Sequence, residues 1–141
     1  MFHIVLVYPE IPHNTGAIGR LALATGSVLH LVEPLGFSLD EKEVRRAGLD
    51  YWRDVQLRRW PSWEAFLEAQ EGPKNLWFFT TKVSRPHWTA DFSTEDYLVF
   101  GAETKGLPSE ILASDPERCL TIPMPGGTTR SLNLATAAGI A

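Results

Sequence analysis

Short apolar runs of strand length recur along this chain, at residues 2–8, 28–32, 55–60, 75–81, 97–101 and 118–122. Most of them are separated by segments in which the apolar residues have helical spacing. Such an alternation is typical of a parallel sheet, because neighbouring parallel strands need a crossover segment between them. The pattern therefore predicts an α/β fold in which helices flank a mainly parallel sheet.

Five helices are expected between and after these runs. The first begins at Asn14, a favourable N-cap residue, and ends at Gly26, with Arg20 lying off its apolar side. The last is only begun when the given sequence stops, so we expect it to be cut short. The remaining helices follow capping and breaker signals and are expected over residues 38–48, 62–71 and 108–113, with the last starting at Ser131 or Leu132.

Length and composition predict one ordinary domain over residues 1–141. An apolar content of 44% is enough to bury a core without disulfides or a structural metal. The single cysteine, Cys119, lies in an apolar run, which fits a reducing, cytoplasmic setting. No apolar run approaches the roughly 18 residues of a membrane span. The four histidines are scattered without metal-ligand spacing, so we expect neither a membrane segment nor a metal site.

The charge of the chain is unevenly distributed. The net charge is −4, yet residues 42–59 contain six basic and three acidic side chains. Two interpretations of this basic segment stay open. It either forms a patch that meets the phosphates of a nucleic acid, which a two-fold dimer would present twice, or it is a solvated helix face and strand edge.

Glycine-bearing loops follow the late strands and not the first one. A dinucleotide-binding unit would place G-x-G-x-x-G directly after the first strand, where this chain has residues 9–16 with a single glycine. The loops 101–108 and 123–131 each follow a late apolar run and contain glycines that let a backbone approach a ligand closely. The sequence therefore predicts a ligand pocket at the carboxyl ends of the C-terminal strands.

Four further segments contain distinctive motifs. They are residues 14–20, 45–51, 100–108 and 122–134, the last with Ile122-Pro123-Met124 and Ser131-x-Asn133-Leu134. Together they resemble the SPOUT superfamily of knotted RNA methyltransferases, and most closely its tRNA (cytidine/uridine-34-2'-O)-methyltransferase branch. The resemblance covers nearly the whole chain, and it implies a C-terminal trefoil knot and S-adenosyl-L-methionine as cofactor.

Carried over position by position, the resemblance implies a cofactor pocket formed by three loops. Glycines suit a backbone that closes on a planar purine, and apolar side chains suit contact with its ring. Other interpretations stay open for single positions: Gly106 as a turn glycine, Phe79 and Ile122 as core residues, Ser131 as the N-cap of the last helix. The implied pocket residues are Phe79, Thr80, Thr81, Gly101, Glu103, Gly106, Ile122, Met124, Ser131 and Leu132.

The same resemblance places Arg20 against the target ribose, opposite the cofactor of the partner subunit in a homodimer. A guanidinium with a pKa above about 12 is a poor proton acceptor, so we interpret Arg20 as an electrostatic activator of the 2'-hydroxyl. The alternative is an exposed helix arginine paired with Glu10 or Glu103. Asn14, Ser131 and Asn133 are further catalytic candidates, and Arg45, Arg46, Tyr51 and Arg53 are the candidates for contact with tRNA.

The expected function is thus 2'-O-methylation of a tRNA ribose, by resemblance at wobble nucleotide 34. A second hypothesis keeps the chemistry and moves the target to ribosomal RNA or to another tRNA site. A third is an RNA- or nucleotide-binding module of the same fold without catalysis, and a fourth is a small α/β nucleotide-binding domain that uses no methyl donor. The simultaneous presence of Asn14, Arg20, Glu103, Ser131 and Asn133 favours an enzyme.

Overall fold

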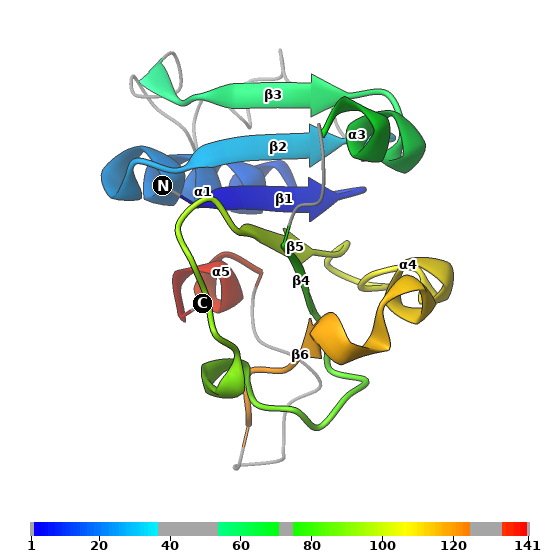
Figure 1. Cartoon of the computed structure of the whole chain (residues 1–141). Helices are drawn as coiled ribbons and strands as arrows, with labels where there is room; N and C mark the ends of the chain where they lie inside the picture. Colours follow the sequence, from blue (N-terminus) through cyan, green and yellow to red (C-terminus); the bar gives the residue numbers. More distant parts are fainter. Residues whose placement is uncertain (1, 37–53, 71–74, 125–133, 141) are drawn as a thin grey trace.

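The computed structural model describes residues 2–36, 54–70, 75–124 and 134–140, and within them the chain forms one six-stranded sheet (Figure 1). The strand order is β3-β2-β1-β5-β4-β6, and every ladder between neighbours is parallel. All six predicted strands are confirmed. They are β1 (His3–Val7), β2 (Val28–Val32), β3 (Leu57–Trp60), β4 (Leu76–Phe79), β5 (Tyr97–Phe100) and β6 (Cys119–Leu120).

Helices cover both faces of the sheet, as a parallel sheet requires. On one face, Ile18 and Ala22 of α1 (Pro12–Thr25) share a core cluster with Leu134 and Ala138 of α5 (Leu134–Ile140). On the other face lie α3 (Trp63–Ala69) and α4 (Ser109–Ser114). None of the helices described is long and apolar enough to cross a bilayer. The helix expected over 38–48 and the predicted start of the last helix lie outside the described residues.

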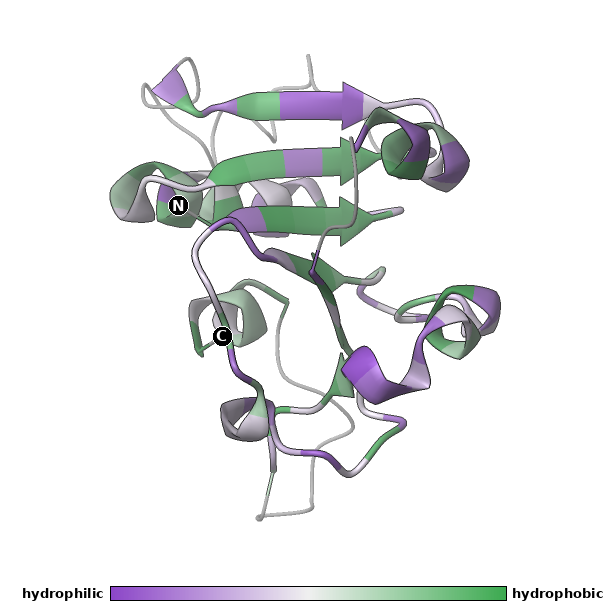
Figure 2. Cartoon of the chain, in the orientation of Figure 1, coloured by the Kyte–Doolittle hydropathy of each residue, from purple (hydrophilic) through white to green (hydrophobic). Residues whose placement is uncertain are grey.

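The sheet is apolar at its centre and polar at one edge. Figure 2 shows β1 and β5 as mostly hydrophobic and β3 as largely hydrophilic. Along β3, Arg58 and Arg59 are exposed, and Arg59 Nη2 donates to Glu33 Oε1 at 3.1 Å. Charged residues on an outer strand disfavour pairing with the sheet of another molecule.

The first helix begins two residues earlier than predicted, so the N-cap interpretation of Asn14 was wrong. The N-cap is Ile11, which makes no side-chain cap bond, and Pro12 occupies the first helical position. Proline is tolerated there because its missing N–H would lack an intrahelical partner in any case. The predicted end is confirmed, since Gly26 takes the left-handed conformation with φ of 70°. Asn14 instead lies buried in the first turn.

Ser62 caps α3, a helix predicted over residues 62–71, because its hydroxyl accepts the Ala65 N–H at 3.0 Å. The helix then buries Trp63 and Phe66 against the sheet.

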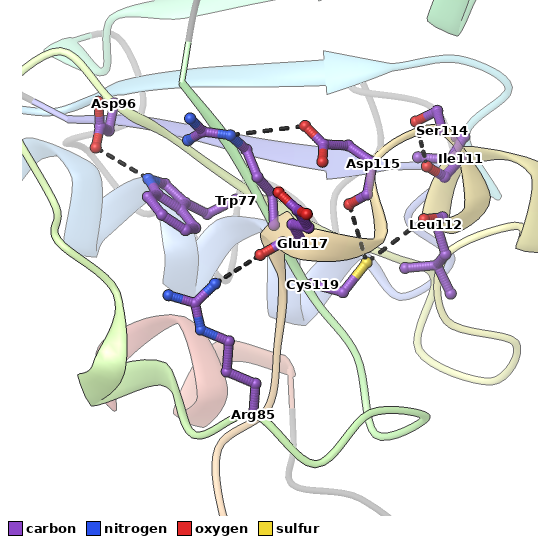
Figure 3. A network of polar contacts seen from close by, with 10 residues as sticks. Trp77, Arg85, Asp96, Ile111, Leu112, Ser114, Asp115, Glu117 and Cys119 are labelled. Carbon is purple, nitrogen blue, oxygen red and sulfur yellow. Dashed lines mark hydrogen bonds and ion pairs between the residues drawn. The ribbon is translucent and has the colours of Figure 1, made fainter.

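Side chains of β4 and of the following segments hold the β6 edge in place (Figure 3). Trp77 Nε1 donates to Asp96 Oδ2 at 2.9 Å, and the Arg118 guanidinium lies 4.6 Å from the centre of the Trp77 ring. Arg85 Nη1 donates to the carbonyl of Glu117 at 2.6 Å. The backbone of Thr121 donates to Arg85 and accepts from His87, so residues 85–87 run beside the chain as it leaves β6. These bonds fix the direction in which residues 121–124 continue.

A buried row of hydrogen bonds crosses β3, β2 and β1 on the face that α3 covers. His30, which is 1% exposed, accepts the Trp60 indole N–H on Nδ1 at 3.0 Å, and its Nε2 lies 2.9 Å from His3 Nδ1. An indole N–H can only donate, so neutral His30 carries its proton on Nε2 and donates it to His3. Burial lowers the pKa of His30 to about 3, with further lowering from His3 and Arg58.

This burial predicts a loss of stability in acid. The pKa of His30 is about 6.5 in an unfolded chain and about 3 in the fold, so between these values the unfolded state binds a proton that the folded state does not. We expect His30 to lower the free energy of unfolding by about 2 kcal/mol between pH 7.5 and pH 5. Urea unfolding at both pH values measures this. His30→Asn keeps a hydrogen-bond acceptor but does not titrate. In this variant the free energy of unfolding should fall by about 2 kcal/mol less between the two pH values than in the wild type. An equal decrease in both proteins would contradict the assignment.

Candidate functional site

A cavity of about 310 Å³ opens at the carboxyl ends of β4, β5 and β6. Its walls are the three segments that follow these strands, 79–82, 100–106 and 121–124, together with α5. The sequence analysis predicted a pocket at this edge, and the structure has one there. All eight described members of the predicted cofactor set line it: Phe79, Thr80, Thr81, Gly101, Glu103, Gly106, Ile122 and Met124.

The cavity has an apolar and a polar side. Phe79 and Phe100 stack with ring centres 4.7 Å apart and lie next to the apolar side chains of the later loop and of α5. Phe79 therefore serves both as a core residue and as part of the wall. The polar lining residues are four threonines, Glu103 and two exposed lysines, Lys82 and Lys105.

The loop after β5 is tightly closed on itself. A Cβ at Gly101 would lie 2.1 Å from both the Gly106 carbonyl carbon and the Leu107 nitrogen, so only glycine fits there. Gly106 has φ of +68°, and its N–H donates to the Ala102 carbonyl at 2.9 Å. The two glycines have separate roles, since one allows a backbone contact and the other a left-handed turn.

The Glu103 carboxylate leaves this loop and reaches the start of α1. Its Oε1 accepts the Glu10 N–H at 2.8 Å, and its Oε2 accepts the Ile11 N–H at 2.7 Å and the Asn14 amide at 3.3 Å. A negative charge at this place also interacts favourably with the helix dipole. Glu103 therefore holds the two residues that lead into α1, and Asn14, the predicted N-cap, donates its side-chain amide to the same carboxylate.

The segment before α1 also supplies a carboxylate to the loop that carries Glu103. Oε1 of Glu10 accepts the Thr104 hydroxyl at 2.7 Å and the Thr104 N–H at 3.0 Å. These two bonds, the hydroxyl first, hold the pKa of the Glu10 carboxyl below its usual value, and Lys105 lowers it further.

Arg20 is exposed on α1 and is not among the residues that line the described cavity. It lies eight residues beyond Pro12, so it is about 12 Å along the helix from the end next to Glu103. The described chain therefore does not bring Arg20 to its own pocket.

Several predicted site residues cannot be placed. Ser131, Leu132 and Asn133, and the tRNA-contact candidates Arg45, Arg46, Tyr51 and Arg53, lie outside the described residues. Within the described part of the chain, no group of three or more His, Cys, Asp or Glu side chains is arranged to hold a metal ion.

Sequence reasoning missed some members of the wall. Thr104 and Lys105 lie inside the glycine-bearing loop 101–108, so their position in this loop could have predicted that they line the pocket. Lys82 follows the predicted pair of threonines in the same way. Leu134 ends the motif Ser131-x-Asn133-Leu134, which was the available signal for it. No local signal marked Ala137, because its place depends on how the last helix packs. The additional lining residues are Lys82, Phe100, Ala102, Thr104, Lys105, Thr121, Leu134 and Ala137.

Comparison with known proteins assigns this chain to a family. The model of the SpoU rRNA Methylase family matches residues 1–141. The chain belongs to this family. Membership of a methylase family agrees with a pocket at the carboxyl ends of C-terminal strands, as the resemblance implied.

The sequences of known relatives align with nearly the full length of this SpoU methylase. The tRNA (cytidine(34)-2'-O)-methyltransferase of Aeromonas hydrophila is 50% identical over 141 residues, covering 99% of this chain and 89% of the relative. A solved structure described as "Structural insights into the 2-OH methylation of C/U34 on tRNA" has a TM-score of 0.94 at 48% identity, covering 99% and 90%. The AdoMet-bound rRNA methyltransferase of Sinorhizobium meliloti has a TM-score of 0.86 at 29% identity, covering 99% and 53%.

Proposed function

We propose that this SpoU methylase transfers the methyl group of S-adenosyl-L-methionine to the 2'-hydroxyl of nucleotide 34, a cytidine or uridine, in tRNA. One observation carries the proposal. Residues 100–106, Ile122 and Met124, which belong to segments that resemble the C34/U34 branch, line one pocket in a chain 50% identical to a tRNA (cytidine(34)-2'-O)-methyltransferase over nearly its whole length. The AdoMet-bound neighbour supports the choice of cofactor.

The residues of the pocket fit this cofactor. The volume of about 310 Å³ lies within the usual range for a small-molecule site. Phe79, Ile122 and Met124 offer an apolar surface to a purine, and the backbone of the 101–106 loop offers polar groups beside it. We also propose that the late loops follow the trefoil-knotted path of the SPOUT methyltransferases. The TM-score of 0.94 to the C/U34 structure supports this path.

When bound, S-adenosylmethionine supplies an electrophilic methyl group on a sulfonium. The chain's own task is then to align the ribose hydroxyl and to ease the loss of its proton. In our proposal Arg20 does the second: its fixed positive charge lowers the pKa of the hydroxyl and stabilises the developing oxyanion. Because Arg20 lies away from its own pocket, we place it at the pocket of a partner subunit in a homodimer. The tRNA then docks where two subunits meet, in the cytoplasm.

Methyl transfer to bulk tRNA from labelled cofactor tests the activity, and mass mapping of the product locates the methyl group. We expect one new 2'-O-methyl group at nucleotide 34, and the same methyl group missing in tRNA from a deletion strain. A methyl group elsewhere in tRNA would refute the position, and an inactive protein that still binds RNA would support a binding module instead.

A second candidate target is ribosomal RNA. The family description and the AdoMet-bound neighbour both refer to rRNA methylation. Labelled transfer to purified ribosomal RNA, run beside the tRNA assay, decides between the two substrates.

The lysines at the pocket suggest how RNA approaches. Lys82 and Lys105 are exposed, and the third charged lining residue, Glu103, directs its carboxylate to α1. The wall thus exposes two ammonium groups, of which Lys105 lies near the Glu10 carboxylate, in a chain of net charge −4. For the double variant Lys82→Ala, Lys105→Ala we expect the dissociation constant for tRNA to rise about tenfold and the logarithmic salt dependence of binding to fall by about two. Filter binding across a salt series measures both. A large loss of S-adenosylhomocysteine affinity would show instead that these lysines hold the cofactor.

A further inference from the structure

We infer that Glu10 and Glu103 are positioning residues for methyl transfer, because their carboxylates join the pocket loop to the start of α1. We call the two side chains, with their partners Ile11, Asn14 and Thr104, the carboxylate clamp. It contains five hydrogen bonds of 2.7–3.3 Å between segments about 90 residues apart in the sequence. The inference rests on the proposed function, since it concerns the geometry of that reaction.

The clamp lies at the topological switch point of the sheet, where the strand order reverses. β1 is central and pairs with β2 on one side and with β5 on the other, so the segments that leave β1 and β5 emerge side by side (Figure 1). The segment after β1 leads into the helix that carries Arg20, and the segment after β5 forms one wall of the pocket. The clamp is a direct polar link between these two parts of the proposed machinery.

Of the two segments, the one after β1 depends more on the clamp. The 101–106 loop is closed by its own backbone through the bond from Gly106 to Ala102. The segment 8–11 begins at Tyr8 with φ of 58° and ends at an N-cap without a side-chain cap of its own. Without the Glu103 acceptors, the segment 8–11 would keep the bonds from Tyr8 N–H to the Val32 carbonyl at 3.1 Å and from Gly36 N–H to the Pro9 carbonyl at 2.9 Å. These bonds hold its first two residues, whereas the N–H groups of Glu10 and Ile11, which lead directly into α1, would lose the Glu103 acceptors.

The expected consequence is a loss of rate rather than of cofactor affinity. A displacement of about 1 Å at a catalytic centre lowers a rate by as much as about 100-fold. The clamp holds the entry to α1, so its loss shifts the first turn relative to the pocket wall while leaving the shape of the wall in place. If the clamp only stabilised the fold, its loss would lower the free energy of unfolding. It would not lower the transfer rate while leaving the cofactor affinity unchanged.

The same substitution at the two positions gives a matched test. Both oxygens of Glu103 accept hydrogen bonds, so Glu103→Gln replaces one acceptor with a donor that faces an N–H group. Only Oε1 of Glu10 accepts, so Glu10→Gln keeps its bonds, whereas Glu10→Ala loses them. Glu68→Ala on the exposed surface of α3 controls for loss of negative charge. Single-turnover methyl transfer to tRNA, S-adenosylhomocysteine calorimetry and amide hydrogen exchange are measured on each full-length protein.

We expect the transfer rate to fall about 10- to 100-fold in Glu103→Gln and about tenfold in Glu10→Ala, and to stay within about threefold of wild type in Glu10→Gln and Glu68→Ala. The dissociation constant of S-adenosylhomocysteine should change less than about threefold throughout. Exchange at the Glu10 and Ile11 amides should accelerate in Glu103→Gln.

Unchanged rates in Glu103→Gln and Glu10→Ala would overturn the inference. So would a loss of S-adenosylhomocysteine affinity that matches the loss of rate, because Glu103 would then contact the cofactor. A wild-type protein that transfers no methyl group refutes the proposed function and with it the catalytic role, while hydrogen exchange still shows whether the clamp holds the segment 8–11.

Discussion

Replacement of Arg20 by alanine is expected to lower the rate of methyl transfer by about 10²- to 10⁴-fold and to leave the affinity for S-adenosylhomocysteine nearly unchanged. The proposed role of the guanidinium is to stabilise charge that develops only in the transition state, so its loss affects the chemical step. Arg20 is exposed and does not line the pocket of its own chain, so its removal does not alter the cofactor walls. Single-turnover kinetics and calorimetry measure the two quantities separately. Equal losses of rate and affinity would contradict the assignment.

Mixed dimers test whether Arg20 acts across subunits. One subunit carries Arg20→Ala, and the other carries Ile122→Trp, which fills the cavity that Ile122 lines. If the site combines the arginine of one subunit with the pocket of the other, the mixed dimer contains one intact site. We then expect about half the wild-type activity per dimer, although neither variant is active alone. No activity in the mixture would place the arginine and the pocket in the same chain.

Gly101→Ala is expected to abolish cofactor binding, with at least a 100-fold loss of S-adenosylhomocysteine affinity. The added Cβ would lie 2.1 Å from the Gly106 carbonyl carbon and from the Leu107 nitrogen, which are backbone atoms that cannot swing aside. The loop must open to accommodate the methyl group, and four of its residues besides Gly101 and Gly106 line the pocket. Calorimetry measures the affinity, and thermal unfolding should show a lower Tm as well.

Gly139→Ala is the matched control for this substitution. Gly139 lies in α5 with nothing within 4 Å of an added Cβ, and alanine is favoured over glycine in a helix by about 1 kcal/mol. We expect unchanged affinity and an equal or higher Tm. A Gly101→Ala protein that binds as tightly as Gly139→Ala would show that the loop opens without cost to the pocket.

The strands could be predicted because each one is marked by an apolar run within its own few residues. Five-residue apolar runs such as Val28–Val32 are buried on both faces of a parallel sheet, so they stand out in the sequence whatever their neighbours are. The end of α1 was equally local, since Gly26 adopts the left-handed turn itself. The start of α1 could not be predicted from nearby residues. Asn14 has the right chemistry for a cap, but the N–H groups before the helix already have an acceptor in Glu103, far away in the sequence.

The order of residues by itself determined the α/β class and the edge of the sheet where a pocket forms, because parallel strands bring the loops after their carboxyl ends together. Eight residues of the pocket wall were implied by the resemblance to the SPOUT methyltransferases. Only the tertiary structure decided where side chains from those loops point. It turned the Glu103 carboxylate toward α1, paired Glu10 with Thr104 and set Arg20 away from its own pocket. Such directions depend on which distant N–H groups lack a partner once the strands have packed, and no local pattern records that.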